Sequence, residues 1–200
     1  MRLLLIRHAQ PDARAPDRCY GRLDVGLSAR GERSARQLAR ALGAVSLTAV
    51  YTSPRIRATR TAQPLAAVNG LSPTIVDALR ELDFGDFEGR RYEDIAREHP
   101  ELFAAWMNEP ASFRFPGGES FADLRSRTLA ATAAIRQRHP REVVAVVSHG
   151  GVIRAILADA LEMPAHAIFR LEQSYGAVSV VDWLDGTPIV RLVNLRPGTP

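Results

Sequence analysis

The chain has 200 residues, of which 46% are apolar and 24% are charged, and this suits one globular domain with one hydrophobic core. The formal net charge is +4 and all 26 basic residues are arginine, but no run of five basic residues occurs, so we expect no nucleic-acid partner. No apolar stretch approaches the ~20 residues of a membrane span, and the first residues do not resemble a leader. The single cysteine, Cys19, has no internal partner for a disulfide. We therefore expect a cytoplasmic protein with no membrane partner, folded as a single domain over residues 1–200, and the sequence carries no signal for an oligomeric state.

The first third of the chain alternates between strand and helix signals. Residues 3–6 are a continuous apolar run, which is typical of a strand buried on both faces. Residues 11–26 are rich in Pro, Asp, Arg and Gly, and are expected to form a loop. A helix should follow, with Ser28 as its N-cap and Gly43 just beyond its last turn. Residues 47–51 predict a second strand.

The second predicted helix begins close behind that strand. Ser53 is expected to cap it and Pro54 to occupy its first position. Pro64 should end or kink it, because proline removes a backbone donor and clashes with the preceding turn. Residues 74–76 predict a short third strand.

The rest of the chain is expected to contain an irregular segment with two short helices, a long helix, a strongly apolar strand, a further helix and a C-terminal hairpin. In chain order, these elements are predicted over residues 92–98, 101–107, 119–138, 143–147, 150–160, 177–183 and 189–195. Repeated strand–helix alternation favours an α/β fold with a mostly parallel central sheet and helices on both faces. In such sheets, ligands bind at the carboxyl ends of the strands.

Three polar clusters fall at such strand ends. Arg7 and His8 end the first strand, His149 ends the most apolar strand, and Arg57 lies in the segment that follows the second strand. Glycines after His149, Gly150 first, would let the backbone approach a ligand at a helix N-terminus, which favours anions. We therefore expect two histidines and two arginines to converge at one edge of the sheet.

Phosphate is the ligand class that this set favours. Two histidines could instead hold a metal ion, but the chain has no His-x₃-His or Cys-x-x-Cys spacing, and neighbouring guanidinium groups would repel a cation. Arginine suits phosphate because its planar fork donates two parallel hydrogen bonds and stays charged. We therefore expect no metal ion and no cofactor.

Five segments resemble the motifs of the histidine phosphatase superfamily, the group that includes cofactor-dependent phosphoglycerate mutase. They occur in the family's order over residues 5–8, 53–62, 81–89, 116–120 and 147–151. The resemblance implies a phosphoglycerate mutase-like fold and a metal-independent phosphomonoesterase that acts on a small phosphorylated substrate.

The resemblance also assigns roles to single residues. His8 would be the nucleophile that becomes phosphorylated, and Glu81 would be the acid that protonates the leaving group. The phosphate pocket and the other substrate contacts would come from Arg7, Arg57, His149, Ser148, Gly150 and Gly21. Glu81 must hold a proton near neutral pH, so we expect a raised pKa for it. The nearby Asp83, Asp86 and Glu88 are interpreted as surface or loop residues.

Two positions depart from the family pattern. Where the family has Thr and Asn after its first motif, this chain has Pro11 and Arg14, so two phosphate contacts are missing. Residues 19–24 resemble the corresponding loop of alpha-ribazole phosphatases, which makes alpha-ribazole 5′-phosphate the leading specific substrate.

Two alternatives share the same residues. A phosphoglycerate mutase would return the phosphoryl group to a sugar acid, but the family's mutases are longer in the middle and at the tail. A non-catalytic protein that binds a phosphorylated ligand would be expected to have lost at least one of the residues with an assigned role, and all are present.

Overall fold

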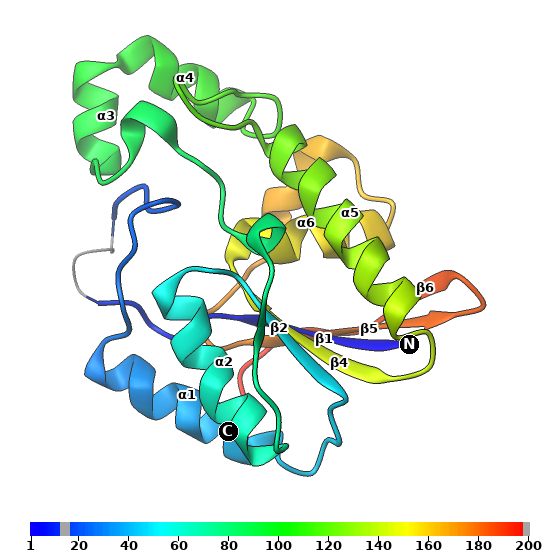
Figure 1. Ribbon diagram of the computed structural model, residues 1–200. Coiled ribbons are helices and arrows are strands. Elements are labelled where there is room, and N and C mark those ends of the chain that lie inside the picture. Colours follow the sequence, from blue (N-terminus) through cyan, green and yellow to red (C-terminus); the bar gives the residue numbers. More distant parts are fainter. Residues whose placement is uncertain (13–16, 198–200) are drawn as a thin grey trace.

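Six strands form one sheet in the computed structural model, which describes residues 1–12 and 17–197 (Figure 1). In chain order they are β1 (Arg2–Arg7), β2 (Ala49–Thr52), β3 (Thr74–Ile75), β4 (Val143–Ser148), β5 (Val178–Leu184) and β6 (Thr187–Leu195). Their spatial order is β3-β2-β4-β1-β5-β6. The first four in this order pair in parallel, and β5 and β6 add an antiparallel edge. The predicted mostly parallel sheet is thereby confirmed.

Helices cover both faces of this sheet. One face carries α1 (Ala29–Ala41) and α2 (Ile56–Val68), and the other carries α5 (Phe121–Arg138) and α6 (Gly150–Ala160) (Figure 1). Side chains of β1 alternate between the two layers, so Leu4 and Ile6 join the core under α1 and α2, while Leu3 and Leu5 join the core under α5 and α6. Burial on both faces is what the continuous apolar run of β1 predicted.

The start of α2 differs from the expectation. The helix begins at Ile56, not at Pro54, and Ser53 does not cap it. Instead, the carboxylate of Asp24, from the distant loop after β1, accepts a hydrogen bond from the Ile56 N–H at 2.8 Å. The interpretation of Pro64 as a possible end of the helix is also wrong, because α2 continues to Val68. Leu65 and Ala66, which directly follow Pro64, are buried in the core under α2, and this packing outweighs the lost backbone hydrogen bond.

Other helix ends follow their sequence signals. The Ser28 side chain accepts a hydrogen bond from the Gly31 N–H at the start of α1. At the start of α5, Ser120 and Asp123 form a reciprocal capping box, in which hydrogen bonds from Ser120 lower the pKa of Asp123 to about 2. In the described residues, no helix is both long enough and apolar enough to cross a membrane.

A third apolar cluster lies beyond the carboxyl edge of the sheet. Between β3 and α5 the chain forms η1 (Asp77–Leu79), η2 (Gly85–Phe87), α3 (Tyr92–Glu98) and α4 (Pro100–Asn108), and η3 (Ala165–Arg170) follows α6. Trp106 of α4 packs edge-on against Phe115 with ring centroids 4.9 Å apart. Cys19 is buried in the same cluster, and burial, with a smaller effect of Glu88, raises the pKa of its thiol to about 12. Cys19 is therefore a packing residue.

Candidate active site

The carboxyl ends of β1, β4 and β2 bring the predicted polar residues together. The His8 N–H donates to the Ser148 carbonyl at 2.8 Å, and the Ser53 N–H donates to the Val147 carbonyl at 3.1 Å. The imidazole rings of His8 and His149 consequently lie with their centroids 5.2 Å apart. The expected convergence of residues at one sheet edge is confirmed.

His8 is held as a neutral ring with a defined tautomer. Its Nδ1 lies 2.8 Å from the Ala9 carbonyl oxygen, which can only accept a hydrogen bond, so Nδ1 carries the hydrogen and Nε2 keeps a lone pair. The side chain is buried, and its pKa lies well below the ordinary value because of burial and the positive charges of Arg57 and Arg7. A neutral imidazole with a free Nε2 can act as a nucleophile.

His149 is neutral for the same reasons. Burial, and then the charge of Arg57, hold its pKa well below the ordinary value. Its Nε2 lies 2.7 Å from the Ser53 hydroxyl, which also accepts the Arg55 N–H. The hydroxyl hydrogen of Ser53 is therefore available to Nε2, and the ring hydrogen of His149 falls on Nδ1, which is buried and has no partner in residues 1–12 and 17–197.

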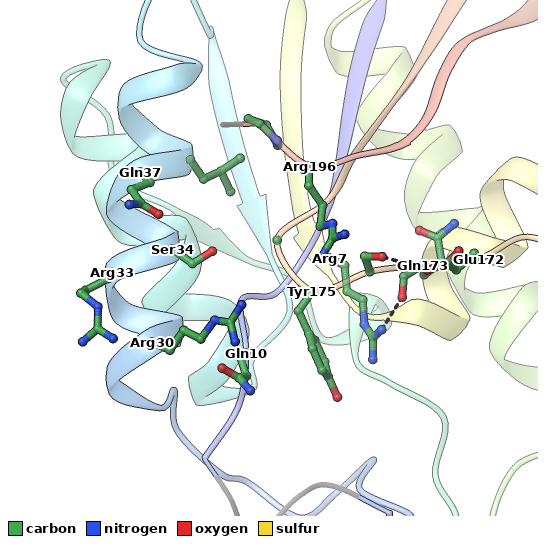
Figure 2. A pocket seen from close by; sticks show the side chains of 14 residues that line it. Arg7, Gln10, Arg30, Arg33, Ser34, Gln37, Glu172, Gln173, Tyr175 and Arg196 are labelled. Carbon is green, nitrogen blue, oxygen red and sulfur yellow. Dashed lines mark hydrogen bonds between the residues drawn. The ribbon is translucent and has the colours of Figure 1, made fainter. Parts of the chain in front are cut away.

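Two guanidinium groups add further free donors. Arg57 is fully buried and donates to the carbonyl oxygens of Leu23, Tyr20 and Gly21 at 2.9–3.2 Å. Arg7 donates to the Gln173 carbonyl (Figure 2). The Nε of each arginine is buried without a hydrogen-bond partner in the described part of the chain. Buried donors rarely lack acceptors, so these two Nε atoms and His149 Nδ1 form an incomplete site that an anion would complete.

Glu81 lies at the N-terminus of α6. Its carboxylate accepts hydrogen bonds from the Leu82 N–H at 2.9 Å and the Gly151 N–H at 3.3 Å. A Cβ atom at position 151 would lie only 2.4 Å from Glu81 Oε1. At Gly150, a Cβ atom would lie 3.0 Å from an Arg154 nitrogen and 3.7 Å from Arg7 Nε. The two glycines therefore make room for the acid and for the guanidinium groups.

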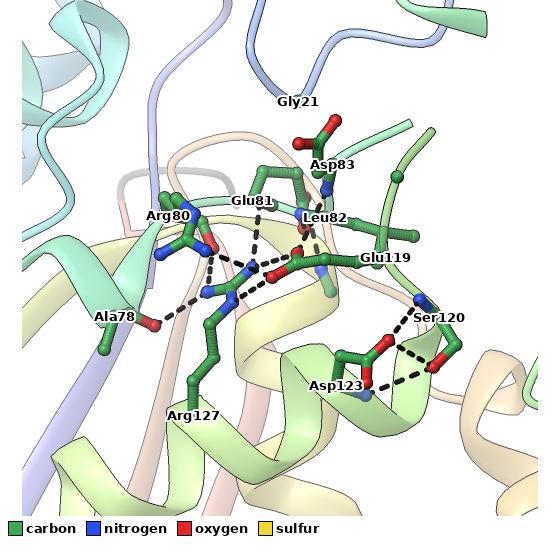
Figure 3. Close-up of polar contacts among 12 residues, drawn as sticks. Gly21, Ala78, Arg80, Glu81, Leu82, Asp83, Glu119, Ser120, Asp123 and Arg127 are labelled. Atoms are coloured by element: carbon green, nitrogen blue, oxygen red, sulfur yellow. Dashed lines mark hydrogen bonds and ion pairs between the residues drawn. The ribbon is translucent and has the colours of Figure 1, made fainter. Parts of the chain in front are cut away.

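A buried ion pair holds the backbone of the Glu81 segment. Arg127 of α5 donates to the carbonyl oxygens of Ala78, Arg80 and Glu81, and its guanidinium also pairs with Glu119 (Figure 3). Burial alone would raise the pKa of Glu119, but hydrogen bonds from Arg127 and the Asp83 N–H keep it below the ordinary value. Arg127 of α5 thus helps to position Glu81 through the backbone of residues 78–81.

Two predicted site residues, and also Glu88, have structural contacts that the sequence does not indicate. The Ser148 hydroxyl donates to the Leu79 carbonyl at 2.7 Å, so it links β4 to η1. Gly21 packs so closely that a Cβ atom would lie 1.7 Å from the Leu82 carbonyl oxygen. Glu88, interpreted as a loop acid, accepts the N–H groups of Gly21, Arg22, Leu23 and Phe84 and so organises the loop that Arg57 contacts. The substrate contacts of Ser148, Gly150 and Gly21 stay predictions.

The structure describes one of the two positions that depart from the family pattern. Pro11 is buried and forms an isolated bridge with Leu27, which fixes the start of the loop. Arg14 lies outside the residues that the structure describes. In the described ranges, no three His, Cys, Asp or Glu side chains are grouped so that they could hold a metal ion.

Sequence reasoning missed an aromatic cavity of about 200 Å³ beside Glu81. It is lined by ring-bearing side chains from separate segments, namely Tyr20, Phe84, Tyr92, Trp106, Phe121 and Phe169, and by the arginines Arg7, Arg18 and Arg154. Arg154 projects from α6, donates to the Leu171 carbonyl and lies over the Phe169 ring. Arg154 lies one helical turn after Gly150, and this spacing is the one signal in the sequence that could have placed Arg154 near the site.

Comparisons with known proteins agree with this geometry. The histidine phosphatase superfamily (branch 1) matches residues 3–196. Phosphoserine phosphatase 1 of Hydrogenobacter thermophilus is 30% identical over 195 residues, which cover 98% of this chain and 92% of the relative. Adenosylcobalamin/alpha-ribazole phosphatase of Escherichia coli is 31% identical over 98% of this chain and 97% of its own length. The crystal structure of a putative alpha-ribazole-5′-P phosphatase from E. coli superposes with a TM-score of 0.90 at 31% identity, covering 98% and 97% of the two chains.

The chain therefore belongs to the histidine phosphatase superfamily. It is a phosphomonoesterase that acts on small phosphorylated substrates, as the resemblance of its motifs implied.

Proposed function

We propose that the chain hydrolyses its substrate in two steps through a phosphohistidine on His8. One observation supports this above all: three buried donors without partners, Arg7 Nε, Arg57 Nε and His149 Nδ1, accompany an imidazole whose Nε2 is free. The non-bridging oxygens of one phosphoryl group would supply the acceptors that these donors lack.

In the first step, His8 Nε2 forms a bond to phosphorus while the bond from phosphorus to the leaving oxygen breaks. Glu81, in its protonated form, transfers its proton to that oxygen, so the leaving group departs as an alcohol. The two arginines and His149 donate to the non-bridging oxygens, where charge concentrates during the transfer. No metal ion is needed in this scheme.

In the second step, the Glu81 carboxylate takes a proton from water as the water oxygen attacks phosphorus. The phosphorus–nitrogen bond breaks, inorganic phosphate is released, and His8 regains its lone pair. Glu81 is then protonated again and ready for the next cycle. The hydrogen bond from the Gly151 N–H, at the N-terminus of α6, keeps the Glu81 carboxylate in place for both proton transfers.

The aromatic cavity supports a leaving group that is flat and largely apolar. Glu81 lines this cavity, so the leaving oxygen should be on that side. Aromatic walls bind planar rings by stacking, and Arg18 and Arg154 can donate to hydroxyl or ring acceptors. Alpha-ribazole 5′-phosphate has these properties, whereas phosphoserine is small and strongly polar. We propose alpha-ribazole 5′-phosphate, or a similar nucleotide with a planar base, as the substrate.

Trapping the intermediate tests the role of His8. Turnover of a substrate that is labelled in its phosphoryl group can be quenched with acid or with alkali. The wild-type protein should keep the label in alkali and lose it in acid, as phosphohistidine does. His8→Ala should lose the label and lower kcat by about 10⁴-fold or more. His166→Ala, at an exposed position in η3, is the matched control and should keep full activity. Label that persists in His8→Ala would contradict the proposal, and so would a loss of activity on dialysis against a metal chelator.

A phosphate-release screen tests the substrate. The value of kcat/KM for alpha-ribazole 5′-phosphate should exceed that for phosphoserine by about 100-fold, or ~3 kcal/mol in transition-state binding. A preference for phosphoserine would reject the planar leaving group. Transfer of the phosphoryl group between phosphoglycerates faster than its release to water would favour the mutase alternative.

We also propose a cytoplasmic location, as expected from the sequence. In support, Cys19 is a free thiol buried in an apolar cluster, so this cysteine does not need an oxidising compartment.

A further inference from the structure

His8 is almost completely enclosed, although a phosphoryl group has to reach it. Its exposed fraction is 1%. Two cavities are lined by neighbours of His8, namely Tyr175 and Tyr20, but not by His8 itself. One is the aromatic cavity. The other, which we call the recess, has a volume of about 690 Å³ and lies between α1 and the turn that precedes β5 (Figure 2). Arg7 lines both cavities.

Two tyrosines cover His8 between these cavities. Tyr175 belongs to the wall of the recess and Tyr20 to the wall of the aromatic cavity. Their ring centroids lie 5.5 Å and 6.3 Å from that of His8, respectively. The two hydroxyl oxygens are 2.7 Å apart, so one tyrosine donates a hydrogen bond to the other across the top of His8.

Each tyrosine ring also faces one of the phosphate-site arginines. The Arg7 guanidinium carbon lies 4.0 Å from the Tyr175 ring centroid, and that of Arg57 lies 4.9 Å from the Tyr20 ring centroid. These are cation–π distances. A phosphoryl group that accepts hydrogen bonds from Arg7 Nε and Arg57 Nε would therefore have to reach them past the two rings.

The same arginines keep the backbone behind each tyrosine in place. Arg57 donates to the carbonyl oxygen of Tyr20, and Arg7 donates to that of Gln173, two residues before Tyr175. These bonds use the terminal nitrogens, so each Nε stays available for an anion. Opening the pair consequently needs a side-chain rotation rather than a displacement of the loops.

We propose that Tyr20 and Tyr175 form a latch over His8 that opens when Tyr175 turns into the recess, and that this latch selects for phosphoryl dianions. The inference rests on the proposed phosphoryl site at His8. Tyr20 keeps its place, because turning into the aromatic cavity would fill the space of the leaving group. An anion with several oxygens can accept hydrogen bonds from both Nε atoms at once and so offset the contacts that Tyr175 loses, whereas a neutral ligand binds the two cations weakly.

The hydroxyl–hydroxyl bond sets part of the balance between the closed and open forms. Burial raises the pKa of Tyr20, so its hydroxyl stays protonated at physiological pH. A neutral hydrogen bond changes an equilibrium by about two- to tenfold. The apparent affinity for phosphate falls by the fraction of molecules that are open, so loss of this bond should tighten binding by a similar factor.

A double-mutant cycle tests the latch, with inorganic phosphate as the probe and titration calorimetry as the measurement. Tyr20→Phe and Tyr175→Phe keep both rings and remove the same hydrogen bond. Each variant, and the double variant, should bind phosphate about two- to tenfold more tightly than the wild type, with no further gain in the double variant. For the substrate, KM should fall by a similar factor.

Three results would overturn the latch. Weaker binding in each single variant, with effects that add in the double variant, would mean that both hydroxyls contact phosphate directly. Unchanged binding in all variants would mean that the pair does not restrict access. Absence of phosphate binding in the wild type would reject the phosphoryl site itself, and with it the proposed function.

A second variant tests the direction of opening without removing either tyrosine. Ser34 of α1 lines the recess, and its hydroxyl oxygen lies 3.2 Å from the position that a Cβ atom at Gly176 would take. Ser34→Trp should fill the space beside Tyr175 and weaken phosphate binding by about two- to tenfold, with thermal unfolding as the check on folding. Unchanged binding in a folded Ser34→Trp protein would contradict the turn of Tyr175 into the recess.

Discussion

The phosphoryl pocket and the aromatic cavity share Arg7 but are built in different ways. The pocket takes its residues from the ends of three adjacent parallel strands, so the hydrogen-bonded register of the sheet fixes their positions. The cavity is lined by residues from strand, loop and helix segments that are spread along the chain between Arg7 and Phe169. This difference places the chemistry on the rigid part of the fold and the choice of substrate on loops and short helices.

Exposure follows the same division. The pocket side chains His8, Arg57 and His149 are at most 1% exposed, whereas Tyr92 and Phe169 of the cavity are 40% and 46% exposed. A change in the pocket therefore disturbs a buried polar network, and a change at an exposed cavity residue such as Phe169 should leave the fold intact. The two regions should accordingly respond differently to substitution and to pH.

Glu81 lies where the two regions meet, and its replacement should have the largest effect. Glu81→Gln removes the proton donor, so kcat for an alkyl phosphate should fall by about 10²–10⁴-fold. An aryl phosphate with an acidic phenol needs no proton on its leaving oxygen, and its rate of phosphohistidine formation should fall by less than about tenfold. Single-turnover kinetics with both substrates measure this difference. Equal losses would mean that Glu81 acts on the pocket rather than on the leaving group.

Acidic pH should weaken the pocket specifically. His8 and His149 have pKa values held well below ordinary by burial, and then by Arg57, whereas in the unfolded chain they titrate near 6.5. Below that pH the unfolded state binds more protons, so this stability is fully present above about pH 6.5 and is lost as the pH falls. At pH 5.5 the loss should be about 1.4 kcal/mol for each histidine, or ~3 kcal/mol for both.

Urea unfolding at pH 7.5 and pH 5.5 measures this effect. His8→Ala should remove about half of the loss in the free energy of unfolding, and the exposed His166→Ala should remove none. A pH dependence that is the same in both variants would show that His8 is already charged in the folded protein or is not buried there.

The smallest effect is expected in the cavity. Phe169→Ala removes an exposed wall of the cavity, so kcat/KM for a substrate with a planar leaving group should fall by about tenfold, with no loss for a small alkyl phosphate. Leu161→Ala is the matched control, because Leu161 is similarly exposed at the end of α6 but is absent from the cavity lining. Equal losses for both substrates would contradict the separation of the two regions.

The strand-end residues were within reach of sequence reasoning. Arg7, His8 and His149 directly follow apolar runs, and parallel strands bring their carboxyl ends to one edge. Arg57 was located through the segment after β2, although the helix begins later than expected because Asp24 supplies the cap. Glu81 has no such periodic signal, and only its resemblance to the family motif singled it out.

The rest depends on tertiary contacts. Tyr20 and Tyr175 are separated by 155 positions, and nothing in either local sequence indicates that their hydroxyl groups meet. Arg127 looks like one more arginine on a long helix, yet it donates to the carbonyl oxygens of Ala78 and Arg80, before Glu81, and to that of Glu81 itself. Pro64 shows the opposite case, in which a strong local signal is overridden by packing of the following turn against the sheet.

The tight packing at Gly21 has a consequence for how the substrate range of this protein could change. Any side chain at this position would strike the Leu82 carbonyl, next to the proposed acid Glu81, so the segment that carries Tyr20 and the segment that carries Glu81 cannot diverge separately. New specificities would have to arise from α4 and η3, whose Trp106 and Phe169 touch the cavity without touching the chemistry. Directed evolution for new phosphate esters should therefore begin there, with the loop around Gly21 held constant.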